Sequence, residues 1–113
     1  MRIYKIFRAA EWQALVRDGS TAGAPVDLAD GFIHFSTAEQ AAETAARHFA
    51  GAAGLVLAAV EAEALGATLR WEPSRGGALF PHLYRPLTLS EIAQHWPLPL
   101  GQDGRHEFPE GLA

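Results

Sequence analysis

The chain has 113 residues and a formal net charge of −4, and 49% of its residues are hydrophobic while 19% are charged. These values are typical of one globular domain that buries its own core, and the negative charge argues against non-specific nucleic-acid binding. There is no cysteine, which excludes disulfides, thiolate metal sites and a cysteine nucleophile.

The N-terminal segment, MRIYKIF, lacks the long apolar run of a signal peptide. The longest nearly charge-free apolar stretch, residues 49–60, is too short to cross a bilayer. We therefore expect a cytoplasmic protein with no membrane contact, forming a single domain over residues 1–113. Residues 97–113 are rich in proline and glycine, and we expect this tail to pack over the surface.

The chain is expected to begin with a strand and a helix. Residues 3–7 are β-branched and aromatic, which favours a strand. Apolar residues then recur at helical spacing over residues 12–16, and Gly19 ends that helix. Residues 18–25 have the composition of a loop.

A second strand and helix follow the turn signal that ends at Gly31. Residues 32–35 favour a strand in which alternation places His34 on the same face as Phe32. Ser36 and Glu39 have the spacing of a capping box, so we expect the clearest helix of the chain to start there.

The second half of the chain predicts further strands around an irregular segment. Residues 55–60 are continuously apolar, which suits a central strand, although a buried helix is the competing interpretation. Residues 61–65 favour a helical turn, residues 68–72 a short strand, and residues 87–96 a strand or short helix. Residues 73–86 show no period, and a loop of that length inside a compact domain is often functional. The elements together predict an α+β fold with a small sheet and two or three helices.

His34 and Glu72 are candidates for chemistry because of their places on strands. His34 is followed at once by an expected helix start, where backbone amides attract anions, but a lone strand histidine is more often a buried residue satisfied by the backbone. Glu72 follows Trp71, and a carboxylate beside an indole in a dry site would have a raised pKa and suit a general base. A surface ion pair with Arg70 or Arg75 is the competing interpretation of Glu72.

The segment Phe80-Pro81-His82-Leu83-Tyr84 combines aromatic rings, a histidine and a proline in the expected loop. Its rings can stack on a base or nicotinamide, while His82 and Tyr84 can form hydrogen bonds to a ligand. Equally, Phe80 and Tyr84 can simply anchor the loop to the core.

Other chemistries have less support in the sequence. His34, His82 and Glu72 match a two-histidine, one-carboxylate metal set, but no pair has the i, i+4 zinc spacing, so we expect no metal. The run Arg75-Gly76-Gly77 lacks the Lys-Ser/Thr ending of a phosphate-binding P-loop, and Ser36 lacks the G-x-S-x-G setting of a serine hydrolase.

Three motifs, in this order, resemble one known family. They are the run from Asp30 to Thr37 with the later Gln40 and Thr44, then Arg70-Trp71-Glu72, and then Phe80-Pro81-His82-Leu83-Tyr84. Over residues 3–92 the chain resembles the small bacterial family catalogued as domain of unknown function 952. The family name supplies no activity.

That family is similar in fold to the ADP-ribosyltransferases and the RNA 2′-phosphotransferases. The resemblance implies a split, mixed or antiparallel sheet around a cleft that binds NAD or an ADP-ribose-like group. In such enzymes a strand His or Arg holds the ribose, which His34 matches, and an aromatic ring, here Tyr84, stacks on the nicotinamide. A late Glu stabilises the oxocarbenium ion. Glu72 precedes Tyr84, whereas the usual order places the acid last, so Glu91 is the other candidate.

We therefore predict a nucleotide-binding cleft with NAD as ligand or substrate, and ADP-ribosyl-type or phosphotransferase-like activity. The alternatives are a non-catalytic small-molecule module and a protein-interaction domain that uses residues 80–84. No oligomeric state is indicated. The expected catalytic residues are Glu72 and His82, and the expected ligand-binding residues are His34, Ser36, Arg75, Phe80 and Tyr84.

Overall fold

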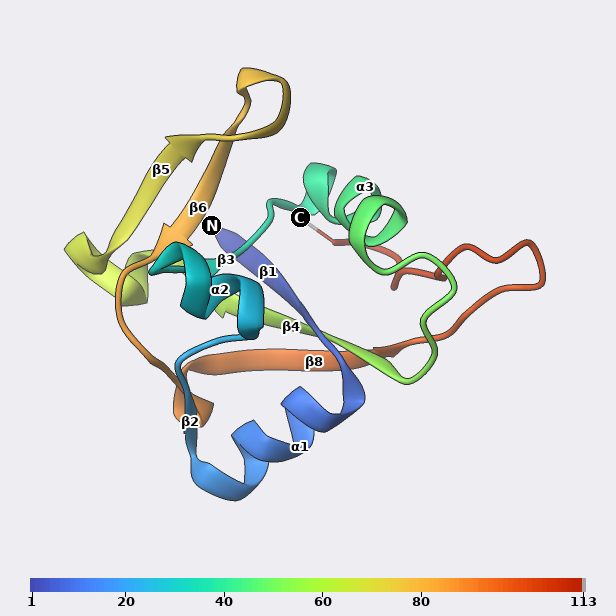
Figure 1. Ribbon diagram of the computed structural model, residues 1–113, viewed down its shortest axis with the longest axis horizontal. Helices are drawn as coiled ribbons and strands as arrows, with labels where there is room; N and C mark the ends of the chain where they lie inside the picture. Colours follow the sequence, from blue (N-terminus) through green and yellow to red (C-terminus); the bar gives the residue numbers. More distant parts are fainter. Residues whose placement is uncertain (113) are drawn as a thin grey trace.

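The computed structural model describes residues 1–112, apart from the side chain of Arg75. Within that part the chain forms three α-helices, α1 (Ala9–Asp18), α2 (Pro25–Asp30) and α3 (Ala38–His48), and three groups of antiparallel strands (Figure 1). Short 3-10 helices cover Ala62–Thr68, Arg75–Gly77 and Leu89–Glu91. No helix in the described residues is long and apolar enough to span a membrane.

The larger sheet has three strands, β1 (Arg2–Phe7), β4 (Leu55–Glu61) and β8 (Ile92–Leu98), in the order β1-β4-β8. The expectation of a central strand at residues 55–60 is confirmed, because β4 pairs with a strand on each side. Its side chains are buried on both faces of the sheet, which explains why the segment is apolar throughout.

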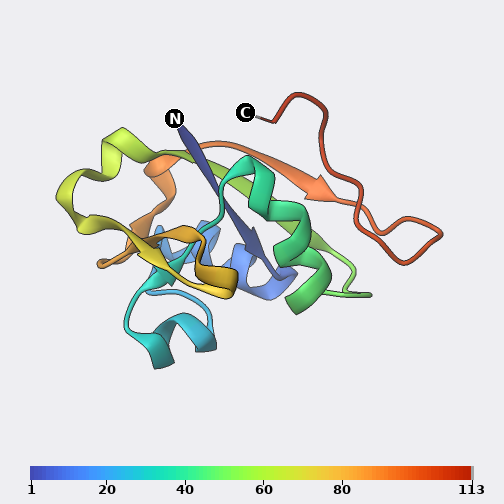
Figure 2. The ribbon, with the colours of Figure 1, turned by 90° about the horizontal axis from the view of Figure 1, so that it is seen from above.

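The two faces of this sheet carry separate halves of the core. Alternation along β1 places Ile3 and Phe7 in one cluster with α1 and a smaller sheet, and Tyr4 and Ile6 in another with α3 and the C-terminal segment. Figures 1 and 2 show α1 and α3 on opposite sides of the larger sheet. Lys5 shares the face of Ile3 and Phe7 and is buried there, so its charge needs a partner.

The smaller sheet has the order β3-β6-β5 and consists of β3 (Ile33–His34), β6 (Leu79–Leu83) and β5 (Leu69–Pro73). The prediction of a long loop over residues 73–86 is wrong, because β6 lies inside it and pairs with strands on both sides. The segment has no period because four of its five side chains are buried, so neither face is polar. Gly76 and Gly77, both with positive φ, form the turn between β5 and β6.

Two further differences concern local structure near His34. Helix α2 was not expected: the sequence predicted a loop up to residue 25 and a turn at Gly31. In the structure Pro25 starts this helix, and Gly31, with φ 85°, ends it. The capping box of α3 is formed by Thr37 and Gln40, not by Ser36 and Glu39. The shift of one residue arises because the Ser36 backbone still pairs with Tyr4 of β1.

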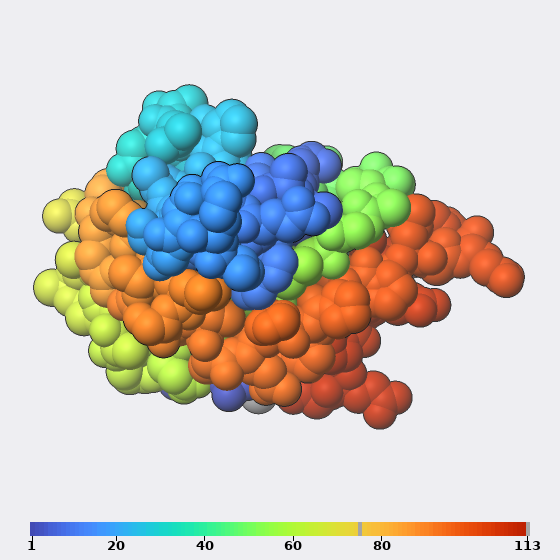
Figure 3. Space-filling view, turned by 90° about the horizontal axis from the view of Figure 1, so that it is seen from below, coloured from blue at the N-terminus to red at the C-terminus, as the bar shows by residue number. Residues whose placement is uncertain are grey.

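Two short strands, β2 (Ser20–Thr21) and β7 (Leu87–Thr88), pair with each other beside α1. The tail packs as expected: Phe108 and Leu112 contact the cluster on the α3 side of the larger sheet. Figure 3 shows α1 in blue, α2 in cyan and β8 in orange on one face, with the C-terminal segment extending from the body.

Candidate functional site

A cleft of about 600 Å³ lies where β1, α2 and α3 meet the smaller sheet. Its walls include four of the predicted site residues, His34, Ser36, Phe80 and His82. Apolar side chains such as Ile6 line much of the rest. The residues predicted from separate motifs therefore do come together, and the volume falls in the range of small-molecule sites, about 300–1,000 Å³.

The cleft is organised by Asp27, a fully buried carboxylate in α2. Its Oδ2 accepts hydrogen bonds from Lys5 Nζ at 3.0 Å and from the Ala24 amide at 2.7 Å. Its Oδ1 accepts from the His34 amide at 3.1 Å and lies 2.6 Å from His34 Nδ1. Burial opposes ionisation, but the His34 hydrogen bond and the Lys5 charge outweigh it and lower the pKa of Asp27 from 3.8 to about 2.

His34 is fixed on both sides of its ring by carboxylates. While Nδ1 faces the buried Asp27, Nε2 lies 3.0 Å from Oδ2 of Asp30, which is 46% exposed. Lys5 also donates to the His34 carbonyl oxygen at 3.4 Å. The ring position is therefore set from α2 and β1, and the exposed Asp30 is the partner that a ligand group can replace.

His82 is paired with His34 in the register of β3 and β6, and the two ring centroids are 5.3 Å apart. The two histidines thus stand side by side on one wall and do not face each other across the cleft. His82 Nδ1 lies 2.8 Å from Oε1 of Glu72, while the buried Nε2 has no hydrogen-bond partner among the described residues. A buried polar atom without a partner is unusual in folded proteins, and a hydrogen-bonding group of a ligand would satisfy it.

Glu72 does not have the raised pKa expected for a carboxylate beside an indole. Neighbouring side chains of a strand point to opposite faces, so Trp71 pairs with Pro81 on one face and Glu72 with Phe80 on the other. Hydrogen bonds from Tyr84, at 2.7 Å, and from His82 lower the pKa of Glu72. Glu72 is therefore ionised near neutral pH, and it lies behind His82 and not among the residues that line the cleft.

Aromatic rings hold this arrangement on the outer side. Phe32 stacks on His82 with centroids 4.1 Å apart and an interplanar angle of 29°. It also contacts His34 and Tyr84, at 4.6 Å and 5.2 Å between centroids. The Arg70 guanidinium lies 4.7 Å from the Tyr84 ring centroid, a cation–π distance. The expected placement of Phe32 and His34 on one face is confirmed.

The four other predicted ligand-binding residues differ in their exposure and in whether they line the cleft. Phe80 is buried and Tyr84 is 38% exposed, and Tyr84 is not among the residues that line the cleft. Ser36 is buried on the cleft wall, but its hydroxyl already pairs with Thr44 at 2.9 Å. Arg75 lies in the turn after β5, and its side chain is outside the described part of the chain, so its role stays a prediction.

Glu91, the alternative acid, serves the fold. It forms two hydrogen bonds with the Arg85 guanidinium, at 3.0 Å and 2.7 Å, and accepts another from the Thr88 amide at 3.0 Å. The Arg85 hydrogen bonds lower the pKa of Glu91 to about 2. Glu91 is not among the residues that line the cleft.

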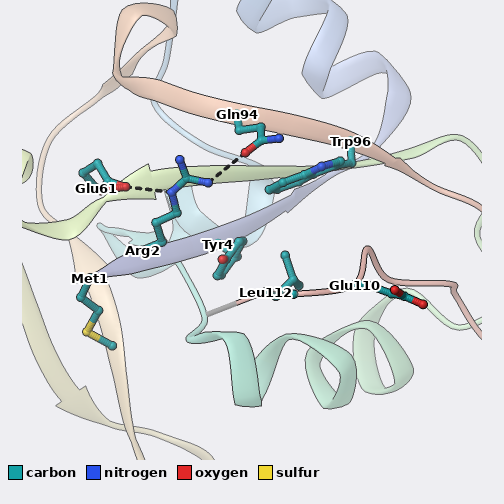
Figure 4. Close-up of a pocket in the computed structure, with 9 residues that line it drawn as sticks. Met1, Arg2, Tyr4, Glu61, Gln94, Trp96, Glu110 and Leu112 are labelled. Atoms are coloured by element: carbon teal, nitrogen blue, oxygen red, sulfur yellow. Dashed lines mark hydrogen bonds and ion pairs between the residues drawn. The ribbon is translucent and has the colours of Figure 1, made fainter.

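A second hollow, of about 580 Å³, lies on the larger sheet beside the C-terminal segment. Figure 4 shows Trp96 and Tyr4 on its walls with Leu112 of the tail beside them. The Arg2 guanidinium there already donates to Glu61 at 2.9 Å and to Gln94 at 3.0 Å (Figure 4). Because Arg2 is held by Glu61 and Gln94, and none of the predicted residues lines it, this hollow is a weaker candidate.

Asp27 and Lys5 are residues of the candidate site that the sequence did not single out. Their pairing depends on a contact between residues 22 positions apart, which no local pattern shows. One available signal was a charged Lys5 inside an otherwise apolar strand, since a lysine at a buried strand position needs a carboxylate. Another was Pro25 followed by Asp27, which is typical of a helix start.

Comparisons with known proteins agree with this fold. The family model described as "Protein of unknown function (DUF952)" matches residues 6–95. The crystal structure of protein CC0527 from Caulobacter crescentus is 58% identical, with a TM-score of 0.91 over 95% of this chain and 94% of that one. The solution NMR structure of CC0527 is 60% identical, with a TM-score of 0.84 over 92% and 90% of the two chains. The comparison with curated proteins found no match.

Proposed function

The chain belongs to the DUF952 family of unknown function, and we propose that its cleft binds a nucleotide-like small molecule of the NAD type. The observation that carries this proposal is Nε2 of His82, a buried atom without a hydrogen-bond partner among the described residues, on a side chain that lines a cleft of about 600 Å³. The surrounding wall is largely apolar with a few converging polar groups, which is the usual make-up of a ligand site.

The cleft offers separate partners for the chemical parts of such a ligand. Phe80 and Phe49 provide apolar surface for a flat ring, while His82 and His34 provide hydrogen bonds for hydroxyl groups. Arg8, also on the wall, donates to the His48 carbonyl oxygen at 3.3 Å, which leaves other guanidinium donors for a phosphate. This cation replaces the start of α3 as the expected phosphate partner, because Thr37 and Gln40 cap that helix.

ADP-ribosyl-type transfer is the activity that fits this ligand. A negative charge stabilises the cationic transition state of glycosidic-bond cleavage. The ionised Glu72 does not line the cleft but contacts His82, so its charge would act on the ligand through the His82 ring. The same cleft also fits a non-catalytic binding module. An interaction patch at residues 80–84 has less support, because Phe80 and His82 are buried in β6.

We expect NAD and ADP-ribose, titrated into the protein, to cause saturable amide chemical-shift changes around His34, Ser36 and the β6 strand. The His34→Ala variant should bind at least about tenfold more weakly, a loss of about 1.4 kcal/mol, because it removes one ring from the wall. His95→Ala, on the exposed part of β8, is the matched control and should bind like the parent protein.

No shift change at millimolar ligand would reject the NAD-type site. Changes confined to the hollow beside Trp96 would place the ligand elsewhere and would also reject it. Equal affinity of His34→Ala and the parent protein would remove the predicted role of His34.

A further inference from the structure

The two ring nitrogens of His82 lie in opposite surroundings. Nδ1 contacts Oε1 of Glu72 at 2.8 Å, and Nε2 is buried, on a residue that lines the cleft, without a partner in the described part of the chain. The side chain is 5% exposed, so the ring is held by its neighbours and not by solvent. Phe32, stacked on one face of the ring, limits its rotation further.

The Glu72 contact determines which nitrogen carries the hydrogen in the neutral ring. An ionised carboxylate accepts hydrogen bonds and cannot donate them. The Tyr84 hydroxyl donates to the same oxygen of Glu72, at 2.7 Å. His82 must therefore place its hydrogen on Nδ1, which leaves the lone pair of Nε2 directed away from Glu72 as a hydrogen-bond acceptor.

We propose that Glu72 and His82 form an acid–base dyad in which His82 Nε2 removes the proton from a water molecule that attacks the bound ligand. His82 is the catalytic residue, and Glu72 is a positioning residue that acts through the His82 ring. The inference rests on the proposed function, since it needs a ligand in the cleft. The proposal gives the cleft a hydrolytic activity that depends on His82, which lines the cleft, and on Glu72, which does not.

With NAD as the ligand, the step balances as follows. The water oxygen bonds to the ribose carbon that carries nicotinamide, and the water proton passes to His82 Nε2. The carbon–nitrogen bond breaks, and its electron pair stays on the nicotinamide ring nitrogen, which becomes neutral. The products are nicotinamide and ADP-ribose, and the proton on His82 then leaves to solvent.

His34 cannot take this role in the same arrangement. Its Nδ1 lies 2.6 Å from Asp27 and its Nε2 lies 3.0 Å from Asp30, so each nitrogen already faces a carboxylate. Nε2 of His82, by contrast, has no partner among the described residues. The two neighbouring histidines thus differ in their surroundings: both nitrogens of His34 face carboxylates, whereas only Nδ1 of His82 does.

The first test examines the free protein and needs no ligand. Long-range proton–nitrogen NMR spectra of the histidine rings should show His82 with its hydrogen on Nδ1. In Glu72→Gln this fixed tautomer should be lost, because a neutral amide no longer requires His82 Nδ1 to act as the donor. Glu43→Gln, on the exposed side of α3, is the matched control.

The second test measures nicotinamide release from NAD. General-base catalysis contributes typically 100-fold or more, so His82→Gln should lower kcat by at least about 100-fold. Glu72→Gln should lower kcat by about 10-fold or more, while KM and the urea midpoint of unfolding stay unchanged. If the role of Glu72 were purely structural, KM and the unfolding midpoint would change instead. Glu43→Gln should leave both constants at parent values.

A His82 ring with its hydrogen on Nε2 would overturn the dyad. Absence of nicotinamide release from the parent protein would overturn it as well. If NAD still shifts the cleft amides in that case, only the dyad fails and the binding site stands. If NAD causes no shifts, the proposed function itself has failed.

Discussion

Replacing Asp27 with alanine is expected to lower the free energy of unfolding by about 3–5 kcal/mol, the usual cost of removing one partner of a buried ion pair. The substitution leaves the buried Lys5 ammonium without its carboxylate and leaves the Ala24 and His34 amides without their acceptor. Urea unfolding followed by circular dichroism measures the change. The cleft wall should lose its order together with this stability, because Asp27 holds the His34 ring.

Asp18→Ala is the matched control for this prediction. Asp18 also pairs with a basic residue, Arg17, at 2.9 Å, but both side chains are more than half exposed. Exposed pairs of this kind contribute about 0–1 kcal/mol. An Asp27→Ala protein that unfolds at the same urea concentration as Asp18→Ala would show that the buried network does not stabilise the fold.

The same carboxylate makes stability depend on pH in a defined window. The pKa of Asp27 is about 2 in the folded protein, below its ordinary 3.8, so its contribution is fully present above about pH 4. It is lost as the pH falls from about 4 to 2, and it amounts to about 2 kcal/mol. Because Glu91 titrates in the same range, the quantity to measure is the difference between the parent protein and Asp27→Asn across this window.

Gly23→Ala is expected to be nearly as damaging, with a loss of about 2–5 kcal/mol from backbone strain and overpacking together. Gly23 has φ 112°, a conformation that alanine rarely adopts. A Cβ there would lie 2.4 Å from Cβ and 2.7 Å from Oδ2 of Asp27. The new methyl group would therefore push directly on the buried carboxylate, and thermal unfolding would report the loss.

Gly31→Ala separates the two causes. Gly31 also has a positive φ, of 85°, but an added Cβ would meet nothing within 4 Å. Its substitution should cost only the left-handed strain, about 1–2 kcal/mol. Equal losses for the two variants would mean that the contact with Asp27 adds nothing and that backbone strain alone explains the Gly23 effect.

Much of the fold was predictable because it depends on local patterns. The apolar run at residues 55–60 indicated the central strand, and Gly19 ended α1 as expected. The β6 strand was missed for a physical reason: it is buried on both sides and contains Pro81, so neither alternation nor propensity marks it as a strand. Only its pairing with β3 and β5 makes it one.

In the candidate site, too, the local residue types were predictable from the sequence and the long-range contacts were not. His34, His82 and Glu72 stood out as unusual residue types in their segments, and the structure places them within one group of contacts. Which of them reaches the cleft was not predictable, because it depends on the register of β5 against β6. The role of Asp27 likewise arises from a contact between α2 and β1 that no motif records.

The most direct test of the ligand site is a crystal structure of the protein grown with NAD or ADP-ribose. The expected result is ligand density in the cleft between α2, α3 and the smaller sheet, with a ligand or water oxygen within hydrogen-bond distance of His82 Nε2. Density only beside Trp96, or a cleft filled by a ligand that leaves His82 Nε2 without a partner, would contradict the proposed function.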